Sequence, residues 1–143
     1  MRVGPQPIIA RPAWYDRNPI DRSRRFWETD VPPHSLTQRW SYMVPSGKKA
    51  WIEVIHVMVR RTIAATTPGI IIARVNYIPK DGATHPLVEV EVTTNTVNDR
   101  HIEHVPTAML LRAGDTIEGQ TVDTSTGGAA LYAVVAKITE FDA

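Results

Sequence analysis

Short runs of β-branched and aromatic residues, each followed by a turn signal, make up the sequence from Leu36 onward. In Leu87–Val92, LVEVEV, valines two apart face a core while Glu89 and Glu91 face water. The turn signals between the runs are PSGKK, TTPG, PKDGATHP, NTVND, RAGD and TSTGG, which begin at residues 45, 66, 79, 95, 112 and 124. Strands and turns at such intervals are typical of a sandwich or barrel, so we expect an all-β fold.

The runs predict about eight strands. They are Gln38–Val44, Ala50–Arg61, Ile70–Ile78, Leu87–Thr94, His101–Val105, Ala108–Arg112, Thr116–Asp123 and Ala129–Phe141. WIEVIHVMV at 51–59 and the last strand carry apolar residues on both faces. A lone sandwich leaves one face of every strand open, so these strands indicate either a subunit interface or a cover formed by the chain's own loops.

The start of the chain has a different composition. Its first 33 residues hold six of the eleven prolines and four of the ten aromatic residues, without a helical apolar period. Proline removes a backbone donor and restricts the residue before it to extended conformations. We therefore expect two parts: an extended, largely irregular arm over residues 1–36 and a β-sandwich over residues 37–143.

This arm carries the candidate binding residues. Each buried aromatic side chain removes roughly 150–250 Å² from water, but ordering each residue costs about 1–2 kcal/mol, so the arm needs a large prepared surface. We expect its aromatic side chains to enter pockets of a neighbouring protein and its arginines to pair with carboxylates there. The candidate interface residues are Trp14, Tyr15, Arg22, Arg24, Arg25, Phe26 and Trp27. Packing of the arm against its own sandwich is the alternative.

Motifs of catalytic and cofactor sites are missing from the sequence. It has no Walker-type glycine loop, no G-x-S-x-G elbow, no H-E-x-x-H helix and no cysteine. HIEH at 101–104 is the best metal candidate, but on a strand His101 and Glu103 share one face while His104 points to the other. The glutamates of LVEVEV could form a carboxylate pair, although a solvated strand face explains them as well. We expect no enzymatic activity, no cofactor, no metal and no small-molecule substrate.

The length, hydropathy and charge of the chain limit the number of domains and the classes of binding partner that we expect. The 143 residues suffice for one compact domain. No window reaches the ~20 apolar residues of a membrane-spanning helix, and MRVGPQPIIARP lacks the apolar stretch of a signal peptide, so we expect a soluble protein without a membrane partner. Residues 1–39 carry seven arginines against four acids, within a net charge of +1. This mild asymmetry fits docking on an acidic protein surface and does not favour nucleic acid.

The whole chain, an aromatic-bearing arm before an all-β body, resembles the capsid decoration proteins of thermophilic tailed phages. MVPSGKKAWIEVIHVMV, LVEVEVTTNTVND and LLRAGDTIEGQTVDTSTGGAALYAVVAKITEF look like jelly-roll modules of phage structural proteins. An L-x-AGD-x-I turn before the final strands is matched by Leu111, Ala113, Gly114, Asp115 and Ile117. These motifs mark turns rather than chemistry, and the resemblance implies an antiparallel β-sandwich of jelly-roll type.

The resemblance also implies a function. Such a protein is a homotrimer that is made in the host cytoplasm, binds the major capsid protein on the capsid exterior and stabilises the virion by bridging capsomers through its arms. No enzymatic activity would follow. The same jelly roll is similar to fibre tips, so the alternative is a carbohydrate- or receptor-binding tip domain with its site in the loops at 79–86 and 95–99.

Overall fold

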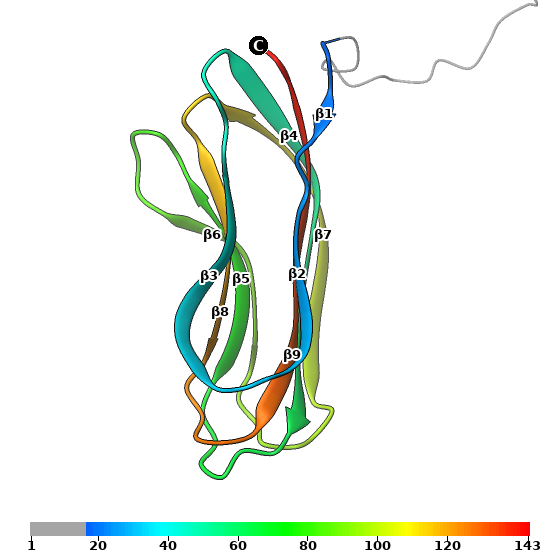
Figure 1. Cartoon of the computed structure of the whole chain (residues 1–143), viewed down its shortest axis with the longest axis vertical. Coiled ribbons are helices and arrows are strands. Elements are labelled where there is room, and N and C mark those ends of the chain that lie inside the picture. Colours follow the sequence, from blue (N-terminus) through cyan, green and yellow to red (C-terminus); the bar gives the residue numbers. More distant parts are fainter. Residues whose placement is uncertain (1–16) are drawn as a thin grey trace, which may run out of the picture.

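Two antiparallel sheets lie face to face in the computed structural model, which describes residues 17–143 (Figure 1). The described residues form strands and connecting turns and no helix, which confirms the all-β prediction. The strands are β1 (Ile20–Asp21), β2 (Arg24–Val31), β3 (His34–Met43), β4 (Lys48–Ile63), β5 (Ile71–Ile78), β6 (His85–Val92), β7 (Arg100–Arg112), β8 (Thr116–Asp123) and β9 (Ala129–Asp142).

The strand order is that of a jelly roll. In the first sheet β9 pairs with β4 on one side, and with β1 and β2 on the other, while β7 lies beyond β4. The second sheet has the order β3-β8-β5-β6. The two-residue β1 continues the edge that β2 forms, so each sheet has four strand positions. The first and last long strands of the chain are neighbours, as two Greek keys wound into a double sheet require.

Strand β2 corrects the prediction of a largely irregular arm for the part that the structure describes, residues 17–36, because Arg24–Val31 pair with β9 and His34 already begins β3. The prolines within residues 17–36 stand outside the strands, at position 19 before β1 and at positions 32 and 33 between β2 and β3. The proline count over the whole segment did not reveal that residues 20–31 contain no proline. Within that stretch Phe26 packs against the core and Trp27 is 47% exposed, the alternation of a half-buried strand.

Strand β7 corrects a second prediction, which divided residues 101–112 into two strands. Pro106 interrupts the sequence pattern, but β7 is an edge strand that pairs only with β4 within residues 17–143, and an edge tolerates a missing backbone donor. The register of the pair shifts beside Pro106, between Ile52 and Val54. The chain therefore continues as one strand past a residue that would end a central one.

Apolar side chains from both sheets meet in the space between them. Ile55, Val57 and Val134 come from the first sheet, Ala73 and Val75 from the second, and all are buried. One polar contact joins the two sheets at this level, because the indole nitrogen of Trp40 on β3 donates to the Val134 carbonyl oxygen at 2.9 Å.

Gly119 on β8 makes room for that tryptophan. A Cβ atom at position 119 would lie 2.4 Å from Cε2 of Trp40, a distance that neither group could keep. The glycine thus serves packing rather than a turn, since its backbone lies within a regular strand.

We expect a protein that lacks residues 1–33 to lose its cooperative fold, because the deletion removes β1 and β2 and leaves the centre of β9 unpaired along one edge. Deletion of residues 1–16 keeps all nine strands and is the matched control. Circular dichroism and thermal unfolding of both proteins measure the outcome. A cooperative transition near that of the full chain in the shorter protein would show that β2 is dispensable.

Candidate functional site

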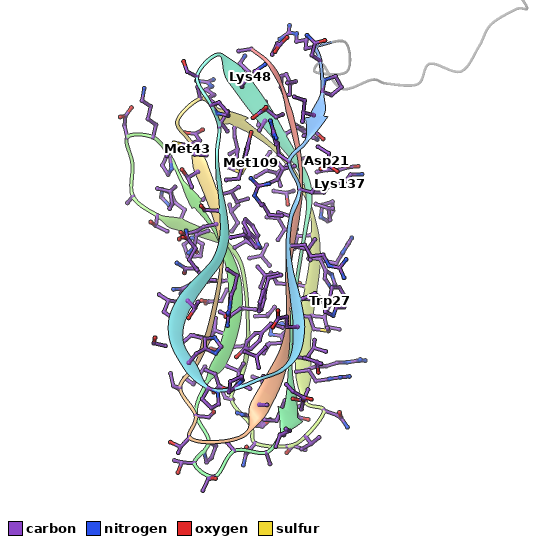
Figure 2. The ribbon with its side chains drawn as sticks, in the orientation of Figure 1. Asp21, Trp27, Met43, Lys48, Met109 and Lys137 are labelled. Atoms are coloured by element: carbon purple, nitrogen blue, oxygen red, sulfur yellow. The ribbon has the colours of Figure 1, made fainter. Side chains whose placement is uncertain are left out.

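The outer face of the first sheet consists of the side chains of β2, β9, β4 and β7 that point away from the second sheet. Alternation along β4 defines it, because Ile55, Val57 and Val59 are buried in the core while His56 and Met58 between them are half-buried. Figure 2 shows Trp27 and Lys137 on this side of the sheet. Its members include Arg25, Trp27, Trp51, Val54, His56, Met58, Ile102, His104, Leu110, Leu131 and Val135.

One row of this face is apolar across all four strands. Trp27 lies opposite Ala133, Ala133 opposite Met58, and Met58 opposite Ile102. Directly opposite residues on one face of a sheet are in contact range. Trp27 is 47% exposed and Ile102 40%, so the row presents large apolar side chains to its surroundings. The sequence pattern of two-sided strands at 51–59 and 129–141 predicted an apolar second face, and the structure contains one.

The next row carries two histidines. Val135 lies between Arg25 and His56, and His104 lies opposite His56 on β7. The two Nδ1 atoms of the histidines are 3.3 Å apart, and the rings meet edge to face with centroids 5.4 Å apart. Trp27 stacks on the His56 ring at 6.0 Å between centroids, with 14° between planes. Burial, and to a lesser extent His104, lower the pKa of His56 below its ordinary value of 6.5.

Of the predicted interface residues, Arg25 and Trp27 are the two that the structure places on the outer face. The Arg25 guanidinium lies 5.3 Å from the centre of the Trp27 ring, within the range of a cation–π contact. Phe26 points the other way and packs against the core, with the Arg39 guanidinium 4.4 Å from its ring centre. Trp14 and Tyr15 lie outside the described residues.

Arg22 and Arg24 have partners within their own chain. Nη2 of Arg22 lies 3.5 Å from Oε2 of Glu140, a buried carboxylate that also accepts a 2.8 Å hydrogen bond from the Tyr42 hydroxyl. Burial and this hydrogen bond raise the pKa of Tyr42. Arg24 donates to the carbonyl oxygens of Ser41 and Arg22 at 3.3 and 2.9 Å. Both arginines thus hold the β1–β2 edge against the sandwich.

The HIEH stretch divides between two faces as its strand spacing predicts. His101 and Glu103 contact one another at 3.3 Å, while His104 meets His56 on the outer face. Within residues 17–143 no three or more His, Cys, Asp or Glu side chains form a group that could hold a metal ion. Sequence reasoning missed the histidine pair because its members are 48 positions apart and meet only through the β4–β7 register.

The second sheet has an outer surface of different character, where polar side chains bond to one another. Glu118 accepts hydrogen bonds from the side-chain amides of Gln38 and Asn76 at 2.8 and 3.2 Å. Arg74 donates to Gln120 at 2.8 Å and lies 3.3 Å from Glu89. These polar groups already have partners within the chain. They are therefore less available to bind another molecule than the apolar side chains on the outer face of the first sheet.

A hollow of about 610 Å³ opens beside the turn at 79–82. Tyr77, Lys80 and Arg112 contribute to its lining. Asp115, which also lines it, accepts hydrogen bonds from the backbone N–H groups of Lys80 and Arg112 at 3.0 and 2.9 Å. This carboxylate therefore joins two turns, which agrees with the structural reading of the AGD motif.

The described residues contain no helix that could span a membrane.

The lowered pKa of His56 predicts a pH-dependent stability. Because the pKa of folded His56 is below 6.5, its contribution is present above pH 6.5 and is lost as the pH falls through the lowered pKa. His56→Gln should therefore reduce the fall in unfolding midpoint between about pH 7.5 and pH 5. His85→Gln, on β6, is the control. Equal pH profiles for wild type and His56→Gln would contradict the assignment.

Comparison with known proteins does not assign the chain to a family. No protein-family model and no curated protein matches the sequence. The solved structure of desmodium yellow mottle tymovirus is similar over 99% of this chain and 96% of that chain, at 9% identity and a TM-score of 0.44. The infectious bursal disease virus Gt strain structure is similar over 96% of this chain, at 13% identity and a TM-score of 0.39. The chain spans only 38% of the length of that second protein. At these TM-scores the assignment of the fold rests on the strand order instead.

Proposed function

We propose that this chain is a viral structural protein without enzymatic activity, a trimeric decoration protein that binds the outside of a tailed-phage capsid. The observation that carries the proposal is the apolar row of the outer face, from Trp27 through Met58 to Ile102. Jelly-roll sandwiches recur in viral capsid and lectin domains, and the sequence resembles phage decoration proteins. Each of these points supports an assembly role rather than catalysis.

The energetic argument starts from exposed side chains. Trp27, Ile102 and Leu110 are each at least 40% exposed, and burial of apolar area stabilises a contact by about 25 cal/mol per Å². Large apolar side chains gathered on one face mark an interaction surface. On the second sheet the exposed large apolar side chains, Leu36 and Met43, lie on the edge strand β3, and the strands β8 and β5 carry bonded polar groups, so a neighbour gains more by covering the first sheet.

The proposed mechanism is mass action. A protein that binds the assembled shell and not its separated parts stabilises the shell by its own binding free energy. In this proposal Arg25 and Trp27 contact a neighbouring subunit through the outer face, while Trp14 and Tyr15 bind the capsid lattice. Phe26, Arg22 and Arg24 serve the interface indirectly, because they hold β2 in the sheet that carries Trp27.

Light scattering of the purified protein and co-sedimentation with empty phage heads test this function. We expect wild type to form a trimer and to co-sediment, and the double variant Trp27→Ser with Leu110→Ser to lose about tenfold or more in oligomer or capsid affinity. Met43→Ser is the matched control, because Met43 is 63% exposed on β3 of the second sheet. The proposal would be contradicted if wild type were monomeric and did not co-sediment with phage heads. It would also be contradicted if Met43→Ser lost as much affinity as the double variant.

A carbohydrate- or receptor-binding tip is the second candidate. The hollow beside residues 79–82 favours it, because Tyr77 offers an aromatic ring while Lys80 and Asp81 offer polar groups for a sugar. A glycan array with saturable signals that Lys80→Ala abolishes would favour this function over capsid binding.

A further inference from the structure

The cross-strand pair His56 and His104 has the nitrogen spacing of two ligands of one metal ion. A tetrahedral zinc ion with Zn–N bonds of about 2.0–2.1 Å separates its ligand nitrogens by about 3.3 Å. The Nδ1 atoms of the pair are 3.3 Å apart. We propose that His56 and His104 form a site for a divalent transition metal of the kind that prefers imidazole, such as zinc, copper or nickel.

The sheet holds the pair in place. The two residues are direct partners in the β4–β7 register, so the backbone hydrogen bonds of both strands fix the spacing of their Cβ atoms. The Trp27 ring lies nearly parallel to the His56 ring, with the two centroids 6.0 Å apart. Two ligands on a rigid pair of strands lose little freedom when a metal binds, which favours chelation over binding at a single histidine.

A metal-binding imidazole must present an unprotonated ring nitrogen to the ion. Without metal, one neutral ring can donate its Nδ1 proton to the other across the 3.3 Å gap. A metal ion would take the place of this hydrogen bond, with each ring carrying its proton on Nε2 and offering Nδ1 to the ion.

The charged groups near the pair do not block a cation. Arg25 on β2 is separated from His56 by Val135 and contacts the Trp27 ring. In the next row, Lys137 on β9 and Glu53 on β4 lie 3.0 Å apart and offset one another. Two further cations, Arg60 on β4 and Arg100 on β7, lie beyond the apolar row that contains Met58 and Ile102.

The proposed site supplies two of the four ligands of a tetrahedral ion, and it faces outward. A tetrahedral ion would keep two further positions for water or for a group of a molecule that covers the outer face. The inference does not depend on the proposed viral function, because it rests on the spacing of two side chains within one chain.

Isothermal titration of the full chain with zinc chloride at about pH 7.5 tests the site. We expect one zinc ion per chain, with affinity lowered about tenfold or more in both His56→Gln and His104→Gln. The matched control is His101→Gln, which changes a histidine of the same strand β7 that faces Glu103. The control should bind zinc as wild type does.

A second readout uses the stacked tryptophan. Copper(II) at the site should quench the emission of Trp27, and Trp27→Phe should lose that part of the quenching while it retains zinc affinity. Circular dichroism checks that each variant is folded. Equal zinc affinity in wild type, His56→Gln and His104→Gln would overturn the proposal, as would a loss confined to His101→Gln. Either result would leave the pair as hydrogen-bonded imidazoles only.

Discussion

The pairing of β2 with β9 is the interaction on which the proposed interaction surface depends. It places Phe26 opposite Val134 and Trp27 opposite Ala133, so adjacent aromatic residues point to opposite faces. A shift of one residue would exchange them and bury the tryptophan between the sheets. Because the register is fixed, Phe26 completes the core, and Trp27 reaches the apolar row and the ring of His56.

The two outer surfaces of the sandwich differ in chemistry and, in this account, in function. On the second sheet, Glu118 and its neighbours satisfy one another's hydrogen bonds, which keeps that surface stable in water. On the first sheet, apolar side chains and a histidine pair remain available. The proposed assembly role and the proposed metal site use the same outer face by different chemistry, so a metal ion held there would lie next to whatever molecule covers Trp27.

Much of the fold could be predicted from local patterns, and the remainder depends on contacts distant in sequence. Alternating valines and turn residues identify the body as all-β, and apolar residues on both sides of 51–59 reveal the outer face. The strand at 24–31 was missed because its alternation is short and flanked by prolines, and only β9 gives it a partner. Pro106 hid the continuity of β7, which the edge position permits. The His56–His104 contact needs the full β4–β7 register and has no local signal.

Native-state hydrogen exchange of the β2 amides measures the central claim directly. If β2 is an integral strand, the amide protons of Arg24–Trp27 that bond to β9 exchange as slowly as those of β4, through global unfolding. The contrary result would be that the β2 amides exchange at the rate of an unfolded peptide while the amides that pair β4 with β9 stay protected. This segment would then not be part of the sheet. In that case the outer face would lose Trp27, and with it the basis for the interaction surface.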